Sequence, residues 1–297
     1  MLFASPAKVN LNLNVGARRA DGYHDVESVF HLISLHDTLE LTAAAAFGFS
    51  CDRDLGIPTD DNLIVKAARA MSELHARPLP DAHIHLTKRI PHGAGLGGGS
   101  SNAATTIYAL SIFWGVRPNC PENLAVAAQL GSDVPLFLAP SAASVMRGRG
   151  EQLAQSLEPL AGLPLVVVYP PGVHSATGEV YRAFDAHPQL TCAQDALIAE
   201  MQRPSPQIAP LLFNNLEEAA LAVSPLTKEI LVWLRANPAV QAAMVAGSGS
   251  ACWALCATLD TAQKLATDAC AQGWWAQACS TATQGIGMLP DDMNPNE

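Results

Sequence analysis

The sequence predicts an α+β protein with two domains. Residues 8–15 alternate polar and apolar side chains, which is the period of a strand with two different faces. Further strand-like segments with interspersed helices follow along all 297 residues. Glycine-rich turns occur in both halves, at 93–99 and 247–249. We therefore expect domains at 1–155 and 156–297, with a ligand in the cleft where each half supplies one turn.

The first half begins with the strand at 8–15 and the turn ARRADGYHD, whose Asp21-Gly22 step is typical of a chain reversal. Asp60 or Asp61 is the expected N-cap of the first helix. The expected strands after the turn are VESVFHLISL, DTLEL and HIHLTKRIP, and a further strand region is ASVMRGRGEQL. The expected helices are DNLIVKAARAMSELHA, SSNAATTIYALSIFWG and PENLAVAAQLG.

The second half begins with LPLVVVYPPGV, a fully apolar strand stopped by two prolines. The chain from there to about Pro210 reads as loop-rich. TKEILVWLRAN and TAQKLATDACAQG are expected helices on either side of a strand–turn–strand unit, AAMVAGSGSACWALC. The polar tail LPDDMNPNE is expected to fray.

Composition limits the possible partners. The chain has 17 basic and 27 acidic residues, a formal net charge of −10. A mean field of this sign repels nucleic acid and anionic membranes, so we expect neither as a partner. A small anionic ligand would need local donors, which gives weight to each lysine near a candidate site.

The cysteines and the start of the chain point to the cytoplasm. Seven cysteines are scattered without a C-x-x-C pair, which favours reduced thiols over a disulfide framework or a zinc site. MLFASPAKVN lacks the pattern of a signal peptide, and no apolar run has the length of a membrane span. We expect a cytoplasmic protein that is a monomer or a weak homodimer.

PHGAGLGGGSSNAATT (91–106) predicts a phosphate site. Glycines let main-chain N–H groups converge on an anion, and the helix that follows adds its N-terminal donors and dipole. Ser100 and Ser101 could cap that helix or donate hydroxyls. No Lys-Ser/Thr follows, so this is not a P-loop, and the dinucleotide pattern G-x-G-x-x-G also fails. The remaining alternative is a tight turn without a ligand.

Two polar residues indicate function only when they are considered together with the glycine-rich stretch at 91–106. Lys8 lies on the polar face of the first strand, where a solvated edge lysine is the ordinary interpretation. Asp133 follows a helix C-terminus in GSDVPLF and, taken alone, reads as the N-cap of a short helix.

Four segments in order resemble the GHMP kinase superfamily: SPAKVNLNLNV with RADGYH, PHGAGLGGGSSNAA, LGSDVPLF and AGSGSACWAL. The likeness covers 6–137 and returns at 245–255. It implies a two-domain GHMP kinase fold that binds ATP and a small-molecule substrate in the interdomain cleft, and transfers the γ-phosphoryl group to an alcohol. PAKVNLNLNV with RADGYH resembles the branch that phosphorylates the 2-hydroxyl of a cytidyl diphosphate-linked methylerythritol in non-mevalonate isoprenoid synthesis.

The resemblance implies roles for individual residues. Lys8 and Asp133 match the catalytic pair, in which a carboxylate takes the alcohol proton and an ammonium keeps that carboxylate ionised. Tyr23 and His24 match the cytidine end, because a pyrimidine needs an aromatic face and a polar edge partner; a core tyrosine that anchors the turn is the alternative for Tyr23.

The residues implied around ATP are Pro91, His92, Gly93, Ala94, Gly95, Leu96, Gly97, Gly98, Gly99, Ser100, Ser101, Asn62 and Lys88. The residues implied around the substrate are Asn10, Tyr23, His24, Tyr181, Gly247, Ser248 and Gly249.

The sequence alone leaves three questions open. Mg²⁺ is expected with the triphosphate, but the sequence assigns no residue to it. A mevalonate or homoserine type of GHMP kinase, or diphosphomevalonate decarboxylase, would share the same general motifs. A non-catalytic binding protein on this fold is a further alternative, although such a protein need keep neither Lys8 nor Asp133.

Overall fold

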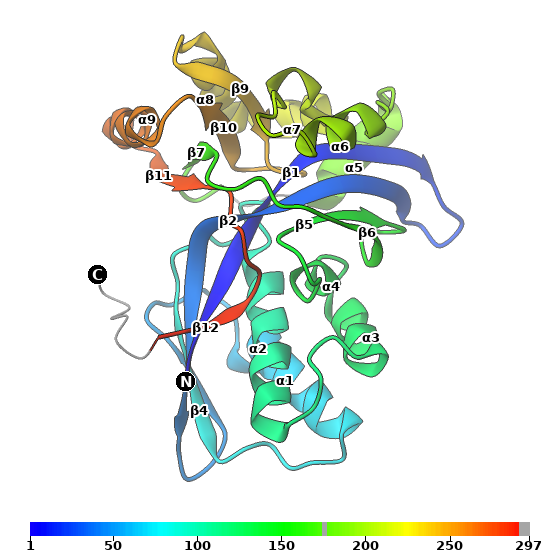
Figure 1. Ribbon diagram of the computed structural model, residues 1–297, viewed down its shortest axis with the longest axis vertical. Coiled ribbons are helices and arrows are strands. Elements are labelled where there is room, and N and C mark those ends of the chain that lie inside the picture. Colours follow the sequence, from blue (N-terminus) through cyan, green and yellow to red (C-terminus); the bar gives the residue numbers. More distant parts are fainter. Residues whose placement is uncertain (174–176, 291–297) are drawn as a thin grey trace.

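The computed structural model describes residues 1–173 and 177–290 (Figure 1). Most of the tail expected to fray, 291–297, lies outside the described residues. Within the described part of the chain, no helix combines the length and the apolar character needed to cross a membrane.

A long antiparallel hairpin of β1 (Leu2–Arg18) and β2 (His24–Ala43) is the spine of the first sheet (Figure 1). The sheet runs β12–β1–β2–β4–β3, with β5 and β6 added beside β2 and with β8 parallel to β1. Its other strands are β3 (Gly48–Cys51), β4 (Ala82–Thr87), β5 (Ala143–Arg147), β6 (Gln152–Leu157), β8 (Phe213–Asn214) and β12 (Gly287–Leu289). The side chains of β1 are buried for most of its length.

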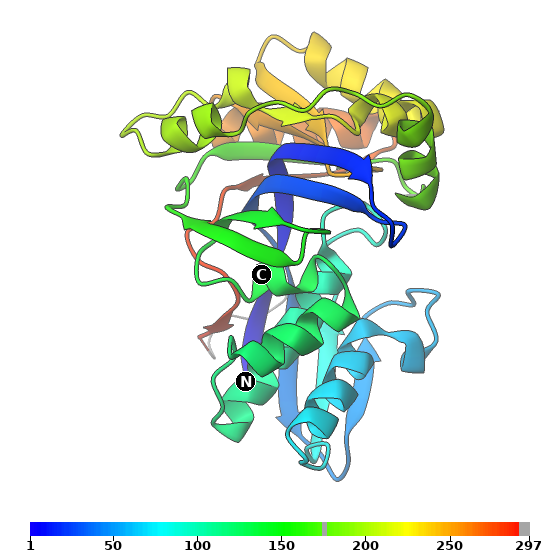
Figure 2. The ribbon, with the colours of Figure 1, turned by 90° about the vertical axis from the view of Figure 1, so that its right-hand side faces the viewer.

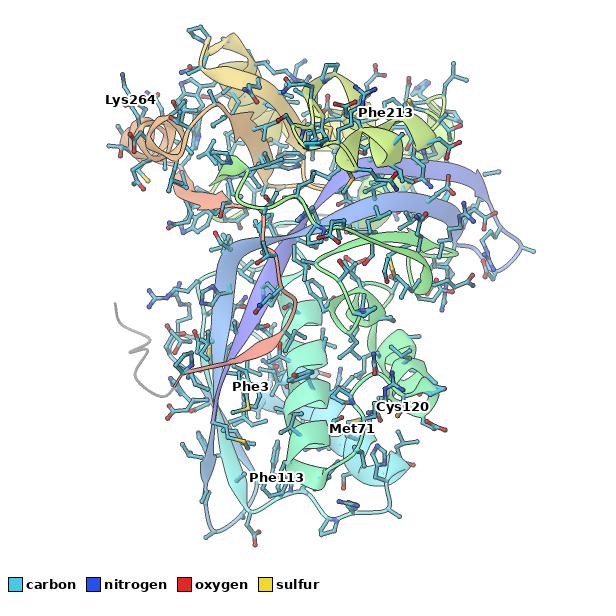
Figure 3. All side chains as sticks on the ribbon, viewed as in Figure 1. Phe3, Met71, Phe113, Cys120, Phe213 and Lys264 are labelled. Carbon is cyan, nitrogen blue, oxygen red and sulfur yellow. The ribbon has the colours of Figure 1, made fainter. Side chains whose placement is uncertain are left out.

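Helices of the first half pack on one face of this sheet. They are α1 (Leu63–Leu74), α2 (Gly98–Trp114), α3 (Pro121–Leu130) and α4 (Val134–Phe137), and a short 3-10 helix, Thr59–Asp61, precedes α1. Figure 2 shows them gathered in the lower half of the view. Their apolar side chains form a cluster with Phe30 and Leu32 of β2. Phe3 and Met71 lie inside this part of the molecule, and both are fully buried (Figure 3).

The second sheet is antiparallel, in the order β11–β7–β10–β9. Its strands are β7 (Pro164–Tyr169), β9 (Val240–Val245), β10 (Cys252–Cys256) and β11 (Trp275–Ser280). The helices around it are α5 (Thr177–Ala186), α6 (Asp195–Met201), α7 (Glu217–Val223), α8 (Pro225–Ala236) and α9 (Leu259–Ala271), and a 3-10 helix spans Ala209–Leu211. One core cluster joins the two sheets, with Val9 and Leu11 of β1 packed among residues that include Val167 and the fully buried Trp253.

The α+β class and the principal elements are confirmed, with three corrections. Asn62, and not Asp60 or Asp61, caps α1, because its Oδ1 accepts from the Ile64 N–H at 3.0 Å. The stretch after Pro171, expected to be loop-rich, contains α5 and α6. Ser100 and Ser101 do not cap α2, whose N-cap is Gly97 without a side-chain bond.

The domain boundary after residue 155 stays a prediction, and the sheets group the chain differently from a single cut. Residues 155 and 156 both lie in β6, a strand of the first sheet. Strands β8 and β12 from the second half of the chain also join that sheet, both beside β1. The second sheet is built entirely from residues after 163.

Candidate active site

The polar face of β1 is buried inside the protein. Lys8 is 4% exposed, and Asn10, Asn12 and Asn14 are at most 5% exposed. The ordinary interpretation of Lys8 as a solvated edge lysine is therefore wrong. Neither β12 nor β8 pairs with β1 at Lys8, and the glycine-rich turn lies on that side instead, where the Leu96 carbonyl accepts from the Lys8 N–H. A row of buried polar side chains costs free energy unless each finds a partner, which points to a functional reason for it.

Lys8 is held by polar and aromatic groups around its ammonium. Nζ lies 3.7 Å from Asp133 Oδ2 and donates to Asn10 Oδ1 at 3.0 Å. The Phe30 ring lies below it, with 5.2 Å between Nζ and the ring centroid. Burial lowers the pKa of Lys8 from its ordinary value, although the charge of Asp133 opposes this shift. The ammonium is thus held in place without the shell of water that surrounds a surface lysine.

Asp133 directs its carboxylate to Lys8 and not to a helix end. It occupies the N-cap position of α4, yet its side chain makes no capping hydrogen bond. Asp133 is therefore the N-cap residue of α4 by position, as its place in the sequence indicates, but its side chain does not cap the helix. Its side chain is 33% exposed, so it can reach a ligand in the cleft while it neighbours the buried ammonium.

The glycine-rich turn packs against β1 and the second half of the chain. The Lys8 N–H donates to the Leu96 carbonyl at 3.0 Å, and the Ala251 N–H donates to the Ala94 carbonyl at 2.9 Å. Gly95 has a φ of +81°, and a Cβ built there would lie 2.3 Å from the Ala246 carbonyl oxygen. Only glycine fits such an approach of two main chains. The turn ends where α2 begins, so the N–H groups of that helix end face the same region.

The second glycine turn closes the other side of Lys8. A Cβ built on Gly247 would lie 3.4 Å from Lys8 Nζ and 3.5 Å from Asn10 Oδ1. Asn214 fixes this turn, because its Nδ2 donates to the carbonyls of Val245 and Gly247. Gly249 has a φ of +85° and follows in the same turn. Two glycine turns from distant parts of the chain thus meet around one lysine.

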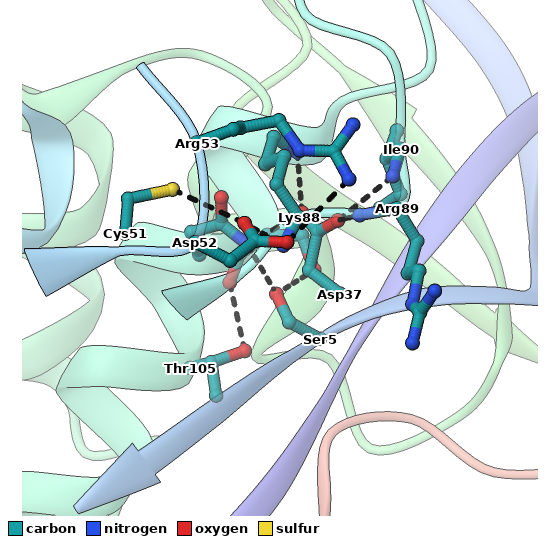
Figure 4. A network of polar contacts seen from close by, with 11 residues as sticks. Ser5, Asp37, Cys51, Asp52, Arg53, Lys88, Arg89, Ile90 and Thr105 are labelled. Atoms are coloured by element: carbon teal, nitrogen blue, oxygen red, sulfur yellow. Dashed lines mark hydrogen bonds and ion pairs between the residues drawn. The ribbon is translucent and has the colours of Figure 1, made fainter. Parts of the chain in front are cut away.

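A buried network lies beneath the first glycine turn (Figure 4). Asp37 is fully buried and pairs with Lys88 Nζ, and it also accepts from the N–H groups of Arg89 and Ile90. Asn102 Nδ2 donates to Asp37 and to Ser5 Oγ. Lys88 therefore lies behind the turn, 2.9 Å from a Cβ built on Gly98.

Ser101 also faces this network. Its hydroxyl is fully buried and accepts from Ser5 Oγ at 2.9 Å. Ser100, one residue earlier, instead lines the cavity in front of the turn. Of the two candidate hydroxyls, Ser100 is the one placed to meet a ligand.

A cavity of about 330 Å³ lies between the two glycine turns. Asp133 is the one acidic residue among the described residues that line it, and Lys8 and Arg149 are its two cations. The remaining lining residues that matter here are Asn10, Gly95, Gly97, Ser100, Ser132, Thr177, Tyr181, Gly247 and Ser248. A larger hollow of about 590 Å³ at β8 and β9 contains neither glycine turn, and the chemistry of the side chains favours the smaller cavity.

Aromatic side chains gather at one end of this region. The His24 ring lies 4.9 Å from that of Tyr181, and His24 is 6% exposed. Tyr23 is 54% exposed, so the alternative of a buried turn-anchoring tyrosine is wrong. The Arg149 guanidinium lies over the Tyr23 ring at 4.8 Å. Burial and the charge of Asp133 raise the pKa of Tyr181 to about 12, which keeps its phenol neutral.

Sequence reasoning missed several residues that position this site. Ser28 accepts from Asn10 Nδ2 at 2.8 Å and thereby fixes the amide that holds Lys8. Arg149 and Thr177 line the cavity, and Thr177 Oγ1 lies 3.1 Å from Ser248 Oγ. The doubled asparagine at 214–215 between apolar segments was the one available signal for Asn214.

Within the described residues, no group of three or more histidine, cysteine or carboxylate side chains could hold a metal ion. Mg²⁺ is bound in many proteins by one or two carboxylates together with water and substrate phosphates. Asp133 and Ser100 at the cavity fit that kind of site, which needs no cage of protein ligands.

Comparisons with known proteins assign the chain to a family. Residues 62–140, which contain the first glycine turn and Asp133, match the family described as GHMP kinases N terminal domain. The 4-diphosphocytidyl-2-C-methyl-D-erythritol kinase of Hyphomonas neptunium is 37% identical, over 96% of this chain and 96% of that protein. The protein of the same name from Pelotomaculum thermopropionicum is 41% identical, over 88% and 90%. This chain belongs to the 4-diphosphocytidyl-2-C-methyl-D-erythritol kinase family.

Solved structures agree with this membership. A crystal structure of 4-(cytidine 5'-diphospho)-2C-methyl-D-erythritol kinase superposes with a TM-score of 0.77 at 34% identity, covering 95% of this chain and 99% of that one. Homoserine kinase from Cytophaga hutchinsonii superposes with a TM-score of 0.67 at 17% identity, covering 97% and 96%, which shows the fold alone. The GHMP kinase fold expected from the sequence is thereby confirmed.

Proposed function

We propose that this protein transfers the γ-phosphoryl group of ATP to the 2-hydroxyl of 4-diphosphocytidyl-2-C-methyl-D-erythritol. Membership of the kinase family supports the activity and the substrate. The observation that supports the chemistry is the buried Lys8 ammonium 3.7 Å from the partly exposed Asp133 carboxylate, at a cavity lined by both glycine turns.

The pair supplies what alcohol phosphorylation needs. In the proposed reaction the substrate oxygen forms a bond to the γ-phosphorus, the bond from that phosphorus to the β,γ-bridging oxygen breaks, and ADP leaves. Asp133 takes the hydroxyl proton as the new bond forms. Lys8 offsets the charge that develops on the transferred group.

The remaining predicted residues surround this pair. We propose that the turn 91–99 and the first residues of α2 bind the ATP phosphates through main-chain N–H groups, with Ser100 donating its hydroxyl. Lys88 and Ser101 act from behind the turn, through Asp37 and Ser5. Asn62, whose side chain caps α1, stays a predicted neighbour of the nucleotide.

We place the substrate on the other side of the pair. Asn10 orients Lys8, and the turn at 247–249 lies beside them. Tyr23, His24 and Tyr181 are proposed to hold the cytosine. Mg²⁺ would neutralise charge on the triphosphate when bound. A cytoplasmic location and a monomer or weak homodimer remain predictions.

A coupled assay of ADP release tests the function. The wild-type protein is given ATP with the cytidyl substrate, mevalonate or homoserine in separate reactions. We expect turnover with the cytidyl substrate alone, and Asp133→Asn serves as the control for chemistry in this site. Turnover of mevalonate or homoserine in its place would assign another GHMP activity, and binding of an ATP analogue without any turnover would indicate a non-catalytic protein.

A further inference from the structure

Two histidines of β4 lie on the outer face of the first sheet. His83 and His85 alternate along the strand with Ile84 and Leu86, which are buried in a core cluster on the other face. Both histidines remain partly exposed. Neither lines the cavity between the two glycine turns. The pair is therefore separate from the candidate active site.

The two imidazole rings converge on one hydroxyl group of the neighbouring strand. His83 Nε2 lies 2.7 Å from Ser50 Oγ on β3, and His85 Nδ1 lies 2.8 Å from the same oxygen. A hydroxyl carries a single proton, so it donates to one ring and accepts from the other. One nitrogen from each ring thus faces the same point on the surface.

The edge strand β3 leaves room for this arrangement. Gly48 lies opposite His83 in the parallel pairing of β3 with β4, and Ser50 lies opposite His85. A Cβ built on Gly48 would lie 2.6 Å from His83 Nδ1. Any other residue at position 48 would therefore push the His83 ring away from Ser50.

The charge around the two rings favours a cation. Glu40 of β2 is exposed and lies directly opposite His85, so the two side chains share one face of the sheet. The chain as a whole has a formal net charge of −10. Glu40 contributes through its charge and not as a ligand, since no group of three histidine, cysteine or carboxylate side chains in the described parts of the chain could hold a metal ion.

We propose that His83 and His85 bind one divalent transition-metal ion of the kind that prefers imidazole, such as Ni²⁺ or Zn²⁺. The ion takes the place between the rings that the Ser50 hydroxyl now fills, and water completes its coordination. Metal–nitrogen bonds of about 2.0–2.1 Å need only a small inward tilt of each ring. The bound ion would fasten the β3 edge strand to β4 through Ser50 and the two rings. This inference is independent of the proposed function.

Binding requires both ring nitrogens to be free of protons. In the neutral rings the proton then lies on Nδ1 of His83 and on Nε2 of His85. Affinity for the metal should therefore fall as the pH is lowered from about 7.5 to about 5.5, because protons compete for the same nitrogens.

Calorimetric titration of the full chain, without a histidine tag, tests the site. Ni²⁺ is the probe, because it prefers imidazole and, unlike Cu²⁺, does not oxidise the seven thiols of the chain. His83→Gln and His85→Gln should each lower the affinity for Ni²⁺ by about tenfold or more. His36→Gln is the matched control, since His36 is an exposed histidine of β2 whose Nδ1 contacts the carbonyl of Ser34 on its own strand. It should leave the affinity unchanged.

A second measurement uses the wild-type protein and does not depend on the folding of a variant. In ¹⁵N NMR spectra, saturation with Zn²⁺ should shift the signals of His83 Nε2 and His85 Nδ1 more than those of the other seven histidines. The same two signals should move together at one metal equivalent.

Several results would overturn the proposal. One is an affinity for Ni²⁺ in both β4 variants within twofold of wild type. Another is an equal loss of affinity in His36→Gln. Unchanged ring signals of His83 and His85 at saturating Zn²⁺ would also overturn it, whatever the variants do. None of these measurements involves ATP or kinase turnover, so failure of the proposed function would leave this inference standing, and the reverse holds as well.

Discussion

Lys8 combines a cost in stability with a proposed role in chemistry. Its ammonium is 4% exposed, and burial lowers its pKa because the charged form loses hydration. Asn10, Phe30 and Asp133 compensate for only part of that hydration. A residue kept at such a cost is a candidate for function on physical grounds.

Replacing Lys8 should therefore separate activity from stability. Lys8→Met should lower kcat by about two to three orders of magnitude, because the charge beside the reacting group is lost. Its free energy of unfolding, measured in urea at pH 7, should stay within about 1 kcal/mol of wild type or rise. Lys66→Met, at an exposed ion pair with Asp61, is the matched control and should keep full activity. A loss of more than about 3 kcal/mol in Lys8→Met would mark Lys8 as structural.

The lowered pKa of Lys8 also predicts how the stability of the protein should change with pH. The folded-state pKa of Lys8 lies below its ordinary value of 10.5, so the unfolded chain binds the proton more tightly. The free energy of unfolding should therefore rise with pH between the folded-state pKa and 10.5. This contribution should disappear in Lys8→Met, and an identical alkaline profile for the two proteins would contradict the direction of the shift.

Asp133 should be needed for chemistry and not for folding. Its carboxylate caps no helix, so Asp133→Asn should keep the fold and the affinity for a non-hydrolysable ATP analogue. Loss of the proton acceptor should reduce kcat by about two to four orders of magnitude. The check is calorimetric titration with the analogue beside single-turnover kinetics. A folded variant with near-normal kcat would remove Asp133 from the mechanism.

At the scale of elements, the two glycine turns and the N-terminal end of α2 determine the geometry of the candidate site. The main chain of Gly95 runs so close to the second turn that a Cβ would lie 2.3 Å from the carbonyl oxygen of Ala246 and 2.6 Å from that of Gly249. These are backbone atoms, which cannot move aside as a flexible side chain can. Their contact joins the proposed phosphate site to the proposed substrate site.

Gly95→Ala tests this contact against a matched glycine. Gly115 has a comparable φ of +67°, but nothing lies within 4 Å of the position that a Cβ would take there. Gly115→Ala should cost only about 1–2 kcal/mol of backbone strain and leave binding of the ATP analogue unchanged. Gly95→Ala should add a steric cost and weaken analogue binding by about tenfold or more. Equal effects of the two substitutions would show that the close approach does not matter.

The packing of strands and turns also explains why parts of the candidate site could not be predicted from the sequence. The alternation of residues 8–15 predicts a strand correctly, but a local pattern cannot say that the two glycine turns pack around its polar face. Lys88 lies five residues before Gly93, the first residue of the glycine turn, yet its partner Asp37 is 51 residues away, on β2. Pairings of this kind depend on strand register, which the sequence does not display.

At the scale of the whole molecule, His31 connects the two sheets. Its ring is fully buried on β2, and Nε2 accepts from the N–H of Leu160, just before β7. Burial lowers the pKa of His31 to about 4. In the folded state His31 therefore stays unprotonated down to about pH 4, whereas in the unfolded chain it binds a proton near pH 6.5.

Stability should fall in acid for this reason. Between about pH 6.5 and pH 4 the unfolded chain binds more protons at His31, so the free energy of unfolding should drop by an amount on the order of 3 kcal/mol. His31→Gln offers an amide oxygen to Leu160 without that proton and should show a flatter profile by urea unfolding. His187→Gln, at an exposed position, should follow wild type. If wild type and His31→Gln lost stability in parallel, His31 would not be the acid-sensitive group.

The sequence by itself determined the α+β class, the family resemblance and the residue types of the proposed catalytic pair, because these depend on local periodicity and on motifs that are contiguous in the chain. Only the tertiary structure decided that the polar face of β1 is buried, that Lys8 lies 3.7 Å from Asp133, and that Asp185 lies beside His24. Those facts depend on strand register and on contacts between segments more than 100 residues apart, and short-range patterns carry no information about such distances.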